Sequence, residues 1–474
     1  MIYGIINKLK NNQKHISKTT KPIKTFFIKK ETRKRRENQK FANIEAPNDF
    51  DLNKEKKEIL NLLENSDRNI FLTGKAGTGK SNFLKYFRAT TKKNVVVLAF
   101  TGVAAINVQG QTIHSFFRFH PQTTLDSIRR LSDDRENIYK KINTIIIDEI
   151  SMVRADLLDL IDKFMRINGP RPGEPFGGVQ IFAIGDLFQL PPIVTSEEEM
   201  FFKINYESPY FFDSKAFADT NFIKKELTKM YRQDDKKQNA FIKALDNIRT
   251  CTFDKKDLDL INSRFIPNYQ KPDKEFVLSL VPTNSTADSI NRVEMAKLKD
   301  KPVTYEGIIS GEFREKDLPT DKSLTLKVGS QVMLLNNDPL GRWVNGDIVK
   351  IIKTDKDSVR VLFDDNTFED ISANTRDSIR FVFDKESGKI QPEIAGSFTQ
   401  LPIKLSWAVT IHKGQGKTFD QVHIDFGRGT FVHGQAYVAL SRCRTLEGMT
   451  LTTPVQSRYI FIDERIKEFM DLNK

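Results

Sequence analysis

Cysteine is scarce in this chain of 474 residues, and long hydrophobic runs are missing. Only Cys251 and Cys443 occur, far apart and without a metal-ligand pattern around them, which excludes a disulfide framework and favours a reducing compartment. No apolar run reaches the roughly 18 residues that a membrane span requires. The longest candidates, such as NVVVLAF at residues 94–100, have the length of a strand. We therefore expect a soluble protein with no membrane partner and with two or three domains.

Acidic residues are almost absent from the first 40 positions. This segment holds thirteen Lys and Arg against two Glu, a net charge of +11, which leaves +2 of the total of +13 for the rest of the chain. We predict a basic, disordered arm over residues 1–48. Three alternatives stay open for it: a tether that binds nucleic acid through counterion release, a solvated tail, or a mitochondrial targeting segment.

Short apolar runs alternate with helical stretches from about residue 50. Each run has the pattern of a buried strand and is followed by a loop rich in Gly, Thr or Asp. This alternation predicts an α/β fold with a parallel sheet covered on both faces, in which ligands bind beyond the carboxyl ends of the strands. The strands predicted for this first domain, residues 49–210, are 69–72, 94–100, 144–148 and 179–184.

A second alternation of strands and helices begins with EFVLSLVPTN and resumes, after an interruption, with VHIDF and MTLTT. The interruption contains short strand-like pieces, DIVKII, SVRVLF and SIRFVF, separated by turn-rich segments. This pattern predicts a small antiparallel barrel over residues 341–400. The second α/β domain is therefore predicted in two parts, residues 211–340 and 401–474.

The segment GKAGTGKS matches the phosphate-loop pattern G-x-x-x-x-G-K-[ST] in full and lies between a predicted strand and an amphipathic stretch. Its glycines allow backbone amides to point at phosphates, Lys80 brings charge to the outer phosphates, and the Ser81 hydroxyl is placed for Mg²⁺. The residues predicted to bind the nucleotide are Gly74, Lys75, Ala76, Gly77, Thr78, Gly79, Lys80 and Ser81.

Two further strand ends supply the chemistry that a phosphate loop lacks. TIIIDEIS ends a buried strand in two carboxylates, of which Asp148 is predicted to hold Mg²⁺ and Glu149 to polarise the attacking water. AIGDLFQLPPI places Gln189 on the loop after another strand, where it can sense the terminal phosphate. Together these residues predict hydrolysis of ATP with Mg²⁺.

Nine segments over about residues 50–460 can be compared with known families. They are, in order, GKAGTGKS, AFTGVAAINVQGQTIHSFF, IIIDEISMV, PFGGVQIFAIGDLFQLPPI, LTKMYRQ, LVPTN, WVNGD, LSWAVTIHKGQGKTFD and GQAYVALSRCRTLEGM. Their order resembles that of the motifs of superfamily 1B DNA helicases. The chain most resembles the Pif-type (petite integration frequency) helicases, with RecD-like helicases next, and PFGGVQ favours the Pif-type group.

This resemblance implies two RecA-like domains that close over one ATP, with an SH3-like barrel inserted in the second. It implies that Arg232 and Arg442 reach the phosphates from the second domain, where a permanent charge can meet the negative charge of the transition state, and that Gly416 lies near the domain interface. Contacts with single-stranded DNA are implied for Thr101, Gly102, His114, Ser115, Phe116, Thr283, Asn284, Thr410, His412 and Lys413. Phe116 could equally be core packing, because the chain contains 36 phenylalanines.

The function that the resemblance implies is an ATP-dependent DNA helicase, a 5′→3′ translocase on single-stranded DNA that acts on forked or tailed duplexes as a monomer. The alternative is a DNA-stimulated ATPase that grips or remodels nucleic acid without processive unwinding. Such a protein is expected in the cytoplasm or nucleoid of a prokaryote, or in the nucleus or mitochondrion of a eukaryote.

Two positions complicate the family pattern. Lys56 stands where the family often has a glutamine that reads adenine, which leaves selectivity for that base open. The segment IHKGQGKTF contains a mimic of a second phosphate loop, but Ile411 stands where such a loop requires Gly. It resembles instead the coupling motif HKSQGxTF, whose His, Lys and Gln face DNA, so Lys417 is expected to be incidental. We therefore expect one ATP per chain.

Overall fold

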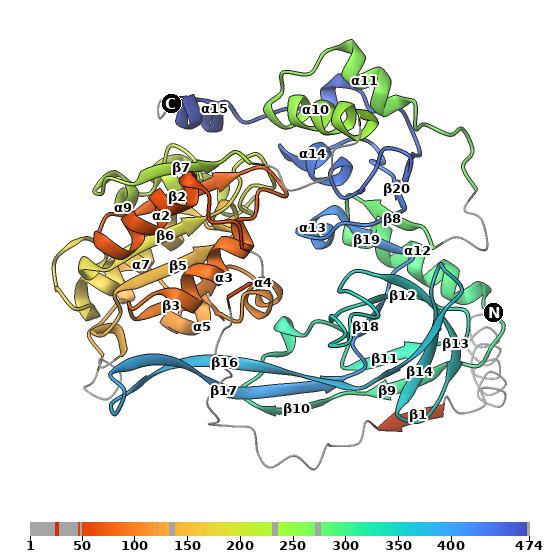
Figure 1. Cartoon of the computed structure of the whole chain (residues 1–474), viewed down its shortest axis with the longest axis horizontal. Helices are drawn as coiled ribbons and strands as arrows, with labels where there is room; N and C mark the ends of the chain where they lie inside the picture. Colours follow the sequence, from red (N-terminus) through yellow and green to blue (C-terminus); the bar gives the residue numbers. More distant parts are fainter. Residues whose placement is uncertain are drawn as a thin grey trace, which may run out of the picture.

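The computed structural model describes residues 24–27, 46–47, 50–120, 122–131, 138–229, 236–270 and 276–471. Figure 1 shows two α/β domains, one at the left and one at the upper right, above a group of antiparallel strands at the lower right. A long two-stranded ribbon runs from these strands beneath the left-hand domain. No helix in the described part of the chain combines the length and apolarity that crossing a membrane demands.

The first domain is built on a six-stranded parallel sheet of order β4-β3-β5-β6-β2-β7. Its strands are continuous apolar runs because both faces are covered: Ile145 and Ile147 pack into one core with α7, and Ile146 packs into another with α3. The strands are β2 (Ile70–Gly74), β3 (Val95–Ala99), β4 (Gln111–Thr112), β5 (Thr144–Asp148), β6 (Gln180–Ile184) and β7 (Ile223–Leu227). The helices are α2 (Lys54–Asn65), α3 (Lys80–Thr90), α4 (Gly102–Asn107), α5 (Ile113–Phe117), α7 (Ala155–Asn168), α8 (Glu199–Asn205) and α9 (Lys215–Ala218).

The second domain has a four-stranded parallel sheet of order β19-β8-β20-β21, with a large hydrophobic core and a small cluster of Val281, Ala287 and Ala408 beside α12. The strands are β8 (Leu278–Val281), β19 (Ala408–Thr410), β20 (Val422–Ile424) and β21 (Met449–Leu451). The helices are α10 (Lys236–Thr250), α11 (Lys255–Asn262), α12 (Asn284–Lys297), α13 (Ile411–Gly414) and α14 (Gln435–Leu440).

The strands of the barrel form two sheets that share one core. The five-stranded sheet has the order β15-β14-β13-β12-β18, and the three-stranded sheet has the order β1-β9-β11. Tyr305 and Leu326 of the smaller sheet pack with Val349 and Ile403 of the larger one. The strands are β1 (Lys24–Phe27), β9 (Val303–Glu306), β11 (Ser323–Leu326), β12 (Gln331–Leu334), β13 (Ile348–Thr354), β14 (Ser358–Leu362), β15 (Phe368–Ser372) and β18 (Ile403–Leu405). The barrel therefore extends beyond the predicted limits of 341 and 400 on both sides.

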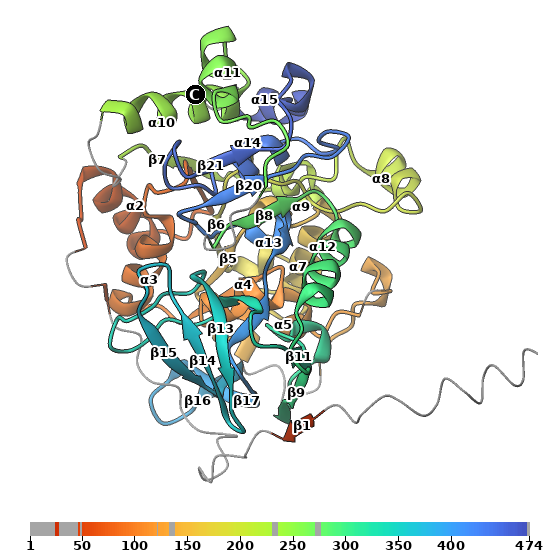
Figure 2. The same cartoon turned by 90° about the vertical axis from the view of Figure 1, so that its right-hand side faces the viewer.

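A short part of the basic arm belongs to this barrel. β1 pairs in parallel with β9 (Figure 2). The Phe26 ring lies 5.7 Å from the Tyr305 ring. This corrects the prediction of disorder for residues 24–27, because they cover an edge of β9 that would otherwise present unpaired backbone groups. Apart from residues 46–47, the rest of the predicted arm lies outside the described residues.

The ribbon below the first domain is a hairpin of β16 (Asn374–Asp384) and β17 (Lys389–Gln400), joined at its base by β10 (Ile308–Gly311). Ile379 and Phe381 lie in the core of the first domain, and the Phe381 ring is 6.2 Å from the Phe116 ring. SIRFVF, predicted as a barrel strand, thus belongs to an arm that leaves the barrel and packs on another domain, because its alternating apolar side chains find their core there.

The C-terminal helix α15 (Glu464–Asp471) returns to the first domain. Ile466 is fully buried in that domain's core, and the Phe469 ring stacks 4.2 Å from the Phe212 ring. The predicted boundaries therefore change at two places. Residues 211–227 belong to the first domain, since β7 pairs with β2, and the last turns of residues 401–474 pack there as well, since this is where the apolar face of α15 is buried.

We expect Ile466→Ala to lower the free energy of unfolding by about 2–5 kcal/mol, because the substitution leaves a cavity in a core that joins the C-terminus to the first domain. Denaturant unfolding followed by far-UV circular dichroism measures this change. Lys467→Ala, at a partly exposed position of α15 where the lysine forms an ion pair with Glu464 of the same helix, is the matched control and should change the value by less than about 0.5 kcal/mol. Equal effects of the two substitutions would mean that α15 does not pack on the first domain in solution.

Candidate ATP site and interdomain cavity

The phosphate loop lies at the carboxyl end of β2 and continues into α3. Gly77 and Gly79 have φ angles of 86° and 88°, a left-handed backbone that side-chain-bearing residues rarely adopt. Thr78 closes the turn by donating its hydroxyl to the Lys75 carbonyl at 2.9 Å. Lys80 and Ser81 begin α3, so the predicted loop has the backbone form that leaves amides free for phosphate oxygens.

Lys80 folds back over this loop. Its Nζ donates to the carbonyls of Gly74 at 2.5 Å and Lys75 at 3.1 Å. Burial lowers the pKa of Lys80, and the nearby carboxylates of Asp186, Glu149 and Asp148 oppose that shift. The ammonium is therefore a buried cation held by neutral carbonyls, which is the condition in which it can exchange them for phosphate oxygens.

Asp148 and Glu149 stand at the carboxyl end of β5. Glu149 has a φ of 52°, which turns the chain sharply after Asp148. Burial raises the pKa of both carboxyl groups, and Lys80 acts against the shift. Two carboxyls buried side by side need positive charge before both can ionise, so the site is suited to receive a cation.

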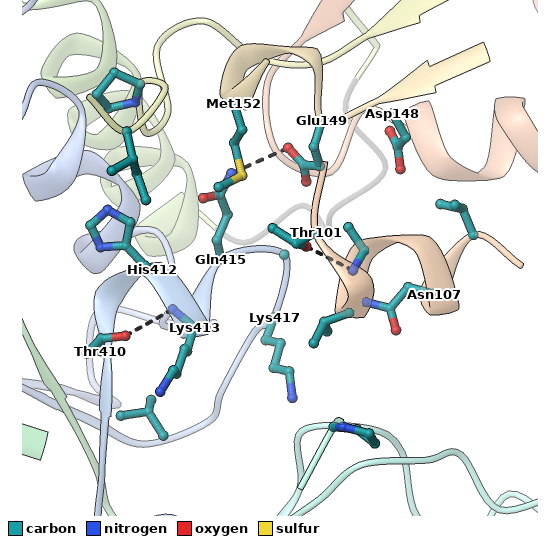
Figure 3. Close-up of a pocket in the computed structure, with 18 of the residues that line it drawn as sticks. Thr101, Asn107, Asp148, Glu149, Met152, Thr410, His412, Lys413, Gln415 and Lys417 are labelled. Atoms are coloured by element: carbon teal, nitrogen blue, oxygen red, sulfur yellow. Dashed lines mark hydrogen bonds between the residues drawn. The ribbon is translucent and has the colours of Figure 1, made fainter. Parts of the chain in front are cut away.

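Glu149 also receives a side chain from the second domain. The Gln415 amide, on the turn after α13, donates to the Glu149 carboxylate at 3.4 Å (Figure 3). The sequence pattern placed the glutamine of this motif against DNA, and the structure places it on the residue predicted to polarise water. No local signal could have revealed this contact, because its two residues are 266 positions apart.

The loop that carries Gln189 is tied to the second domain by a buried ion pair. Arg249 of α10 donates to both Asp186 oxygens, at 2.8 and 3.3 Å, and its guanidinium lies 4.2 Å from the Phe188 ring centre. The Asp186 and Arg249 side chains are 1% and 3% exposed. Gln189 donates to Asp186 at 3.2 Å, so the predicted phosphate sensor belongs to the same cluster. Burial alone would raise the pKa of Asp186, but Arg249 keeps it below its ordinary value.

Sequence reasoning missed Arg249, although a signal exists. It lies on the same stripe of α10 as the buried residues Phe241, Leu245 and Ile248, where a charge is unexpected unless it is paired. A second contact of α10 reaches the phosphate loop itself, since Lys75 Nζ lies 2.7 Å from Asp246 Oδ2. The Ala76 amide is likewise hydrogen-bonded to the Tyr437 hydroxyl of α14, whose pKa burial raises to about 12.

Arg442 is 4% exposed and follows α14. Its guanidinium donates to the carbonyls of Val438 at 2.9 Å and Lys417 at 3.0 Å. In this arrangement the predicted transition-state arginine is held by its own domain. Its charge acts across the interface on Glu149, where it opposes the rise in pKa that burial causes. Arg232, the other predicted arginine, lies outside the described residues.

Three threonines at strand ends share one local structure. Thr101 after β3, Thr283 after β8 and Thr410 at the end of β19 each accept a hydrogen bond from a backbone amide two or three residues into the next helix. All three line a cavity of about 1700 Å³ between the domains, here called the interdomain cavity. The other predicted residues on its wall are Ser81, Asp148, Glu149, Asn284, His412, Lys413 and Gly416.

Gly416 supports the turn that carries Gln415. Its φ is 76°, and no atom lies within 4 Å of the position that a Cβ would take. Glycine is therefore favoured at this position by the left-handed backbone conformation, since there is space for a side chain. Ile411 before it is fully buried, and the segment forms α13 and a turn, so it has no phosphate-loop geometry.

Four predicted DNA residues lie elsewhere. Phe116 is 5% exposed and packs against Phe117 and Tyr139, so it has no free ring face for a base, and the core interpretation holds for it. His114 is not on the wall of the interdomain cavity. Gly102 and Ser115 line a separate pocket of about 450 Å³ under the ribbon, where Asp317 lies against Gly102. The ribbon and the segment before β11 therefore cover this side of α4 and α5.

Lys56 has a structural role. Its Nζ donates to the Asp51 carbonyl at 2.8 Å and lies 4.5 Å from the Phe50 ring centre. Burial lowers the pKa of this lysine. Its side chain holds the segment before α2, and its ammonium, which only donates, cannot make the paired donor and acceptor contacts with which a glutamine amide reads adenine.

Comparison with known proteins agrees with this architecture. Residues 51–259 match the family model described as PIF1-like helicase. The chain is 30% identical over 438 residues to the ATP-dependent DNA helicase Pif1 of Bdellovibrio bacteriovorus, which covers 90% of this chain and 93% of that protein. It is 32% identical to the protein of the same name from Psychrobacter sp., over 81% of this chain and 65% of the longer relative.

Two solved structures show the same fold. Bacteroides sp Pif1 in complex with ADP-AlF4 is 36% identical, with a TM-score of 0.81 over 90% of this chain and 97% of that chain. Bacteroides Pif1 bound to ssDNA has the same identity and coverage and a TM-score of 0.65. The predicted α/β fold and the resemblance to Pif-type helicases are confirmed. Because 30% identity extends over nearly the whole Bdellovibrio protein and the fold is shared as well, the chain belongs to the PIF1-like helicase family.

Proposed function

We propose that the protein is an ATP-dependent helicase that translocates 5′→3′ on single-stranded DNA and unwinds forked or tailed duplexes as a monomer. The observation that carries the proposal is the interdomain cavity, whose wall joins the carboxylates of the ATP site to the strand-end threonines of both domains. Gln415, at the end of the short helix that Thr410 caps, contacts Glu149. If a bound DNA strand moved α13, it would therefore also move the Gln415 amide, which contacts Glu149.

Mg²⁺ fits the residues present. Within the described residues, no three His, Cys, Asp or Glu side chains form a metal cage, which suits a cation that takes few protein ligands and several from phosphates and water. The Ser81 hydroxyl and the Asp148 carboxylate would hold it. Bound there, it would supply positive charge to the phosphates and to the buried carboxyl pair.

The chain's own groups account for the remaining steps. Lys80 orients the outer phosphates, Glu149 accepts a proton from the attacking water, and Gln189 and Arg442 respond to charge at the terminal phosphate. The direction of movement is carried over from the family. A DNA-stimulated ATPase without unwinding is the alternative, and it would need the same residues.

ATP turnover with and without single-stranded DNA, measured beside strand displacement on 5′-tailed and 3′-tailed duplexes, tests the proposal. We expect stimulation by DNA and displacement of the 5′-tailed duplex only. Lys80→Ala should lower turnover by on the order of 10² or more, since it removes the main cation on the phosphates. Stimulated turnover without displacement of either duplex would favour the alternative.

Arg442→Ala is expected to keep ATP and DNA binding and to lower turnover by on the order of 10³. Arg442→Lys should remain strongly impaired, because a lysine keeps the charge but lacks the planar guanidinium whose separate N–H groups hold the carbonyls of Val438 and Lys417 and can still reach a phosphate. Single-turnover hydrolysis and equilibrium binding of a fluorescent ATP analogue separate the two effects. Normal turnover in Arg442→Ala would rule out a role at the phosphates.

Gln415→Ala tests the bridge to Glu149. We expect the turnover number at saturating DNA to fall on the order of tenfold, with the KM for ATP and the affinity for DNA nearly unchanged, because the amide positions Glu149 and binds neither ligand. Gln415→Asn, with a shorter reach, should give an intermediate value. Gln421→Ala, at an exposed position before β20, is the control. A fall in DNA affinity with an unchanged turnover number would instead place Gln415 on the strand.

A further inference from the structure

Three cations from three different elements line the barrel side of the interdomain cavity. Arg376 is on β16, Lys404 is on β18, and Lys417 follows α13. All three side chains are half-buried. In the described part of the chain, none of them forms an ion pair with a carboxylate.

Lys417 is held in place by neutral groups. Its Nζ lies 3.2 Å from the Asn345 side-chain oxygen and 3.0 Å from the Met333 sulfur. Burial, together with the charges of Arg376 and Lys404, lowers the pKa of Lys417 to about 8. Asp321 and Asp288 raise the pKa of Lys404, but burial and the charge of Lys413 outweigh them. Figure 3 shows Lys417 and Lys413 extending into the same open region of the cavity.

Such an arrangement is unfavourable in the protein alone. Half-buried cations that repel one another lose hydration without gaining an anionic partner, and a bound anion relieves both penalties. The same cavity is also lined by Thr101, Thr283 and Thr410, whose hydroxyl groups can donate to phosphate oxygens. Single-stranded DNA offers phosphates at successive positions along such a wall.

We propose that Arg376, Lys404 and Lys417 bind a backbone phosphate of the single strand, so that the barrel and the ribbon form part of the strand's path. This inference rests on the proposed function. It corrects the expectation that Lys417 is incidental. It leaves hydrolysis at saturating DNA to the phosphate-loop residues, since none of the three cations is a ligand of the nucleotide in this arrangement.

The test is the salt dependence of binding of a fluorescent oligothymidylate to the full chain, measured by anisotropy. Lys417→Leu, Lys404→Gln and Arg376→Gln should each weaken binding severalfold. The slope of log affinity against log salt should fall by about 0.7 for each phosphate that the variant no longer neutralises. Lys417→Arg should keep the wild-type slope. Lys353→Gln is the matched control, because Lys353 lies on the same sheet but is exposed and paired with Asp355 at 2.8 Å.

The outcomes separate the proposals. A wild-type slope in all three charge-removing variants, or weaker binding with an unchanged slope, would overturn this inference and leave the helicase proposal standing. Wild-type protein whose ATP turnover does not respond to DNA would overturn the helicase proposal itself. A further experiment adds inorganic phosphate at constant ionic strength and measures whether it displaces the oligonucleotide. Displacement of the oligonucleotide from wild type, but not from a Lys404→Gln, Lys417→Leu double variant, would support the assignment of the cluster to a phosphate of the strand.

Discussion

The buried ion pair between Asp186 and Arg249 is the contact on which the arrangement of the two α/β domains depends. Both side chains are almost fully buried, and each would be a buried, uncompensated charge if the other were withdrawn. The two hydrogen bonds and the adjacent Phe188 ring fix the relative orientation of the loop and α10. The loop that carries Gln189 and the helix that contacts Lys75 must therefore move together.

The chain reinforces this arrangement by crossing between domains more than once. The ribbon of β16 and β17 starts in the barrel and buries Ile379 and Phe381 in the first domain, while α15 returns there from the second domain. Tyr210 donates to Asp463 at 3.0 Å, just before α15 begins. A change at the ATP site can thus be transmitted to the barrel through packed elements and not through a flexible linker alone.

The two charged regions of the interdomain cavity are complementary in sign. The ATP side has the buried carboxyls of Asp148 and Glu149, whose pKa values burial raises, and the barrel side has cations without carboxylate partners among the described residues. The first set suits a metal-bound nucleotide, and the second suits a polyanion. The turn that carries Gln415, Gly416 and Lys417 lies between them and contributes one side chain to each.

Much of the site could be predicted from the sequence, because its parts are contiguous. The phosphate loop, the acidic pair at the end of β5 and the threonines at strand ends are encoded within a few residues, where glycine torsion, side-chain capping and buried apolar runs dictate the backbone. The parallel sheets and the antiparallel insertion followed from the same local patterns. The structure confirms the α/β fold class that these patterns predicted.

The tertiary structure decided which distant residues meet. Four features join segments that are far apart in the chain: the ion pair of Arg249, the contact of Gln415 with Glu149, the burial of Phe116 and the packing of α15 on the first domain. Local periodicity does not indicate which distant residues will be partners. The domain limits shifted for the same reason, since β7 and α15 are assigned by the surface that buries them. Lys417 is the clearest case: its motif gave it no role, and only the cations that the fold gathers around it make it a candidate for binding phosphate.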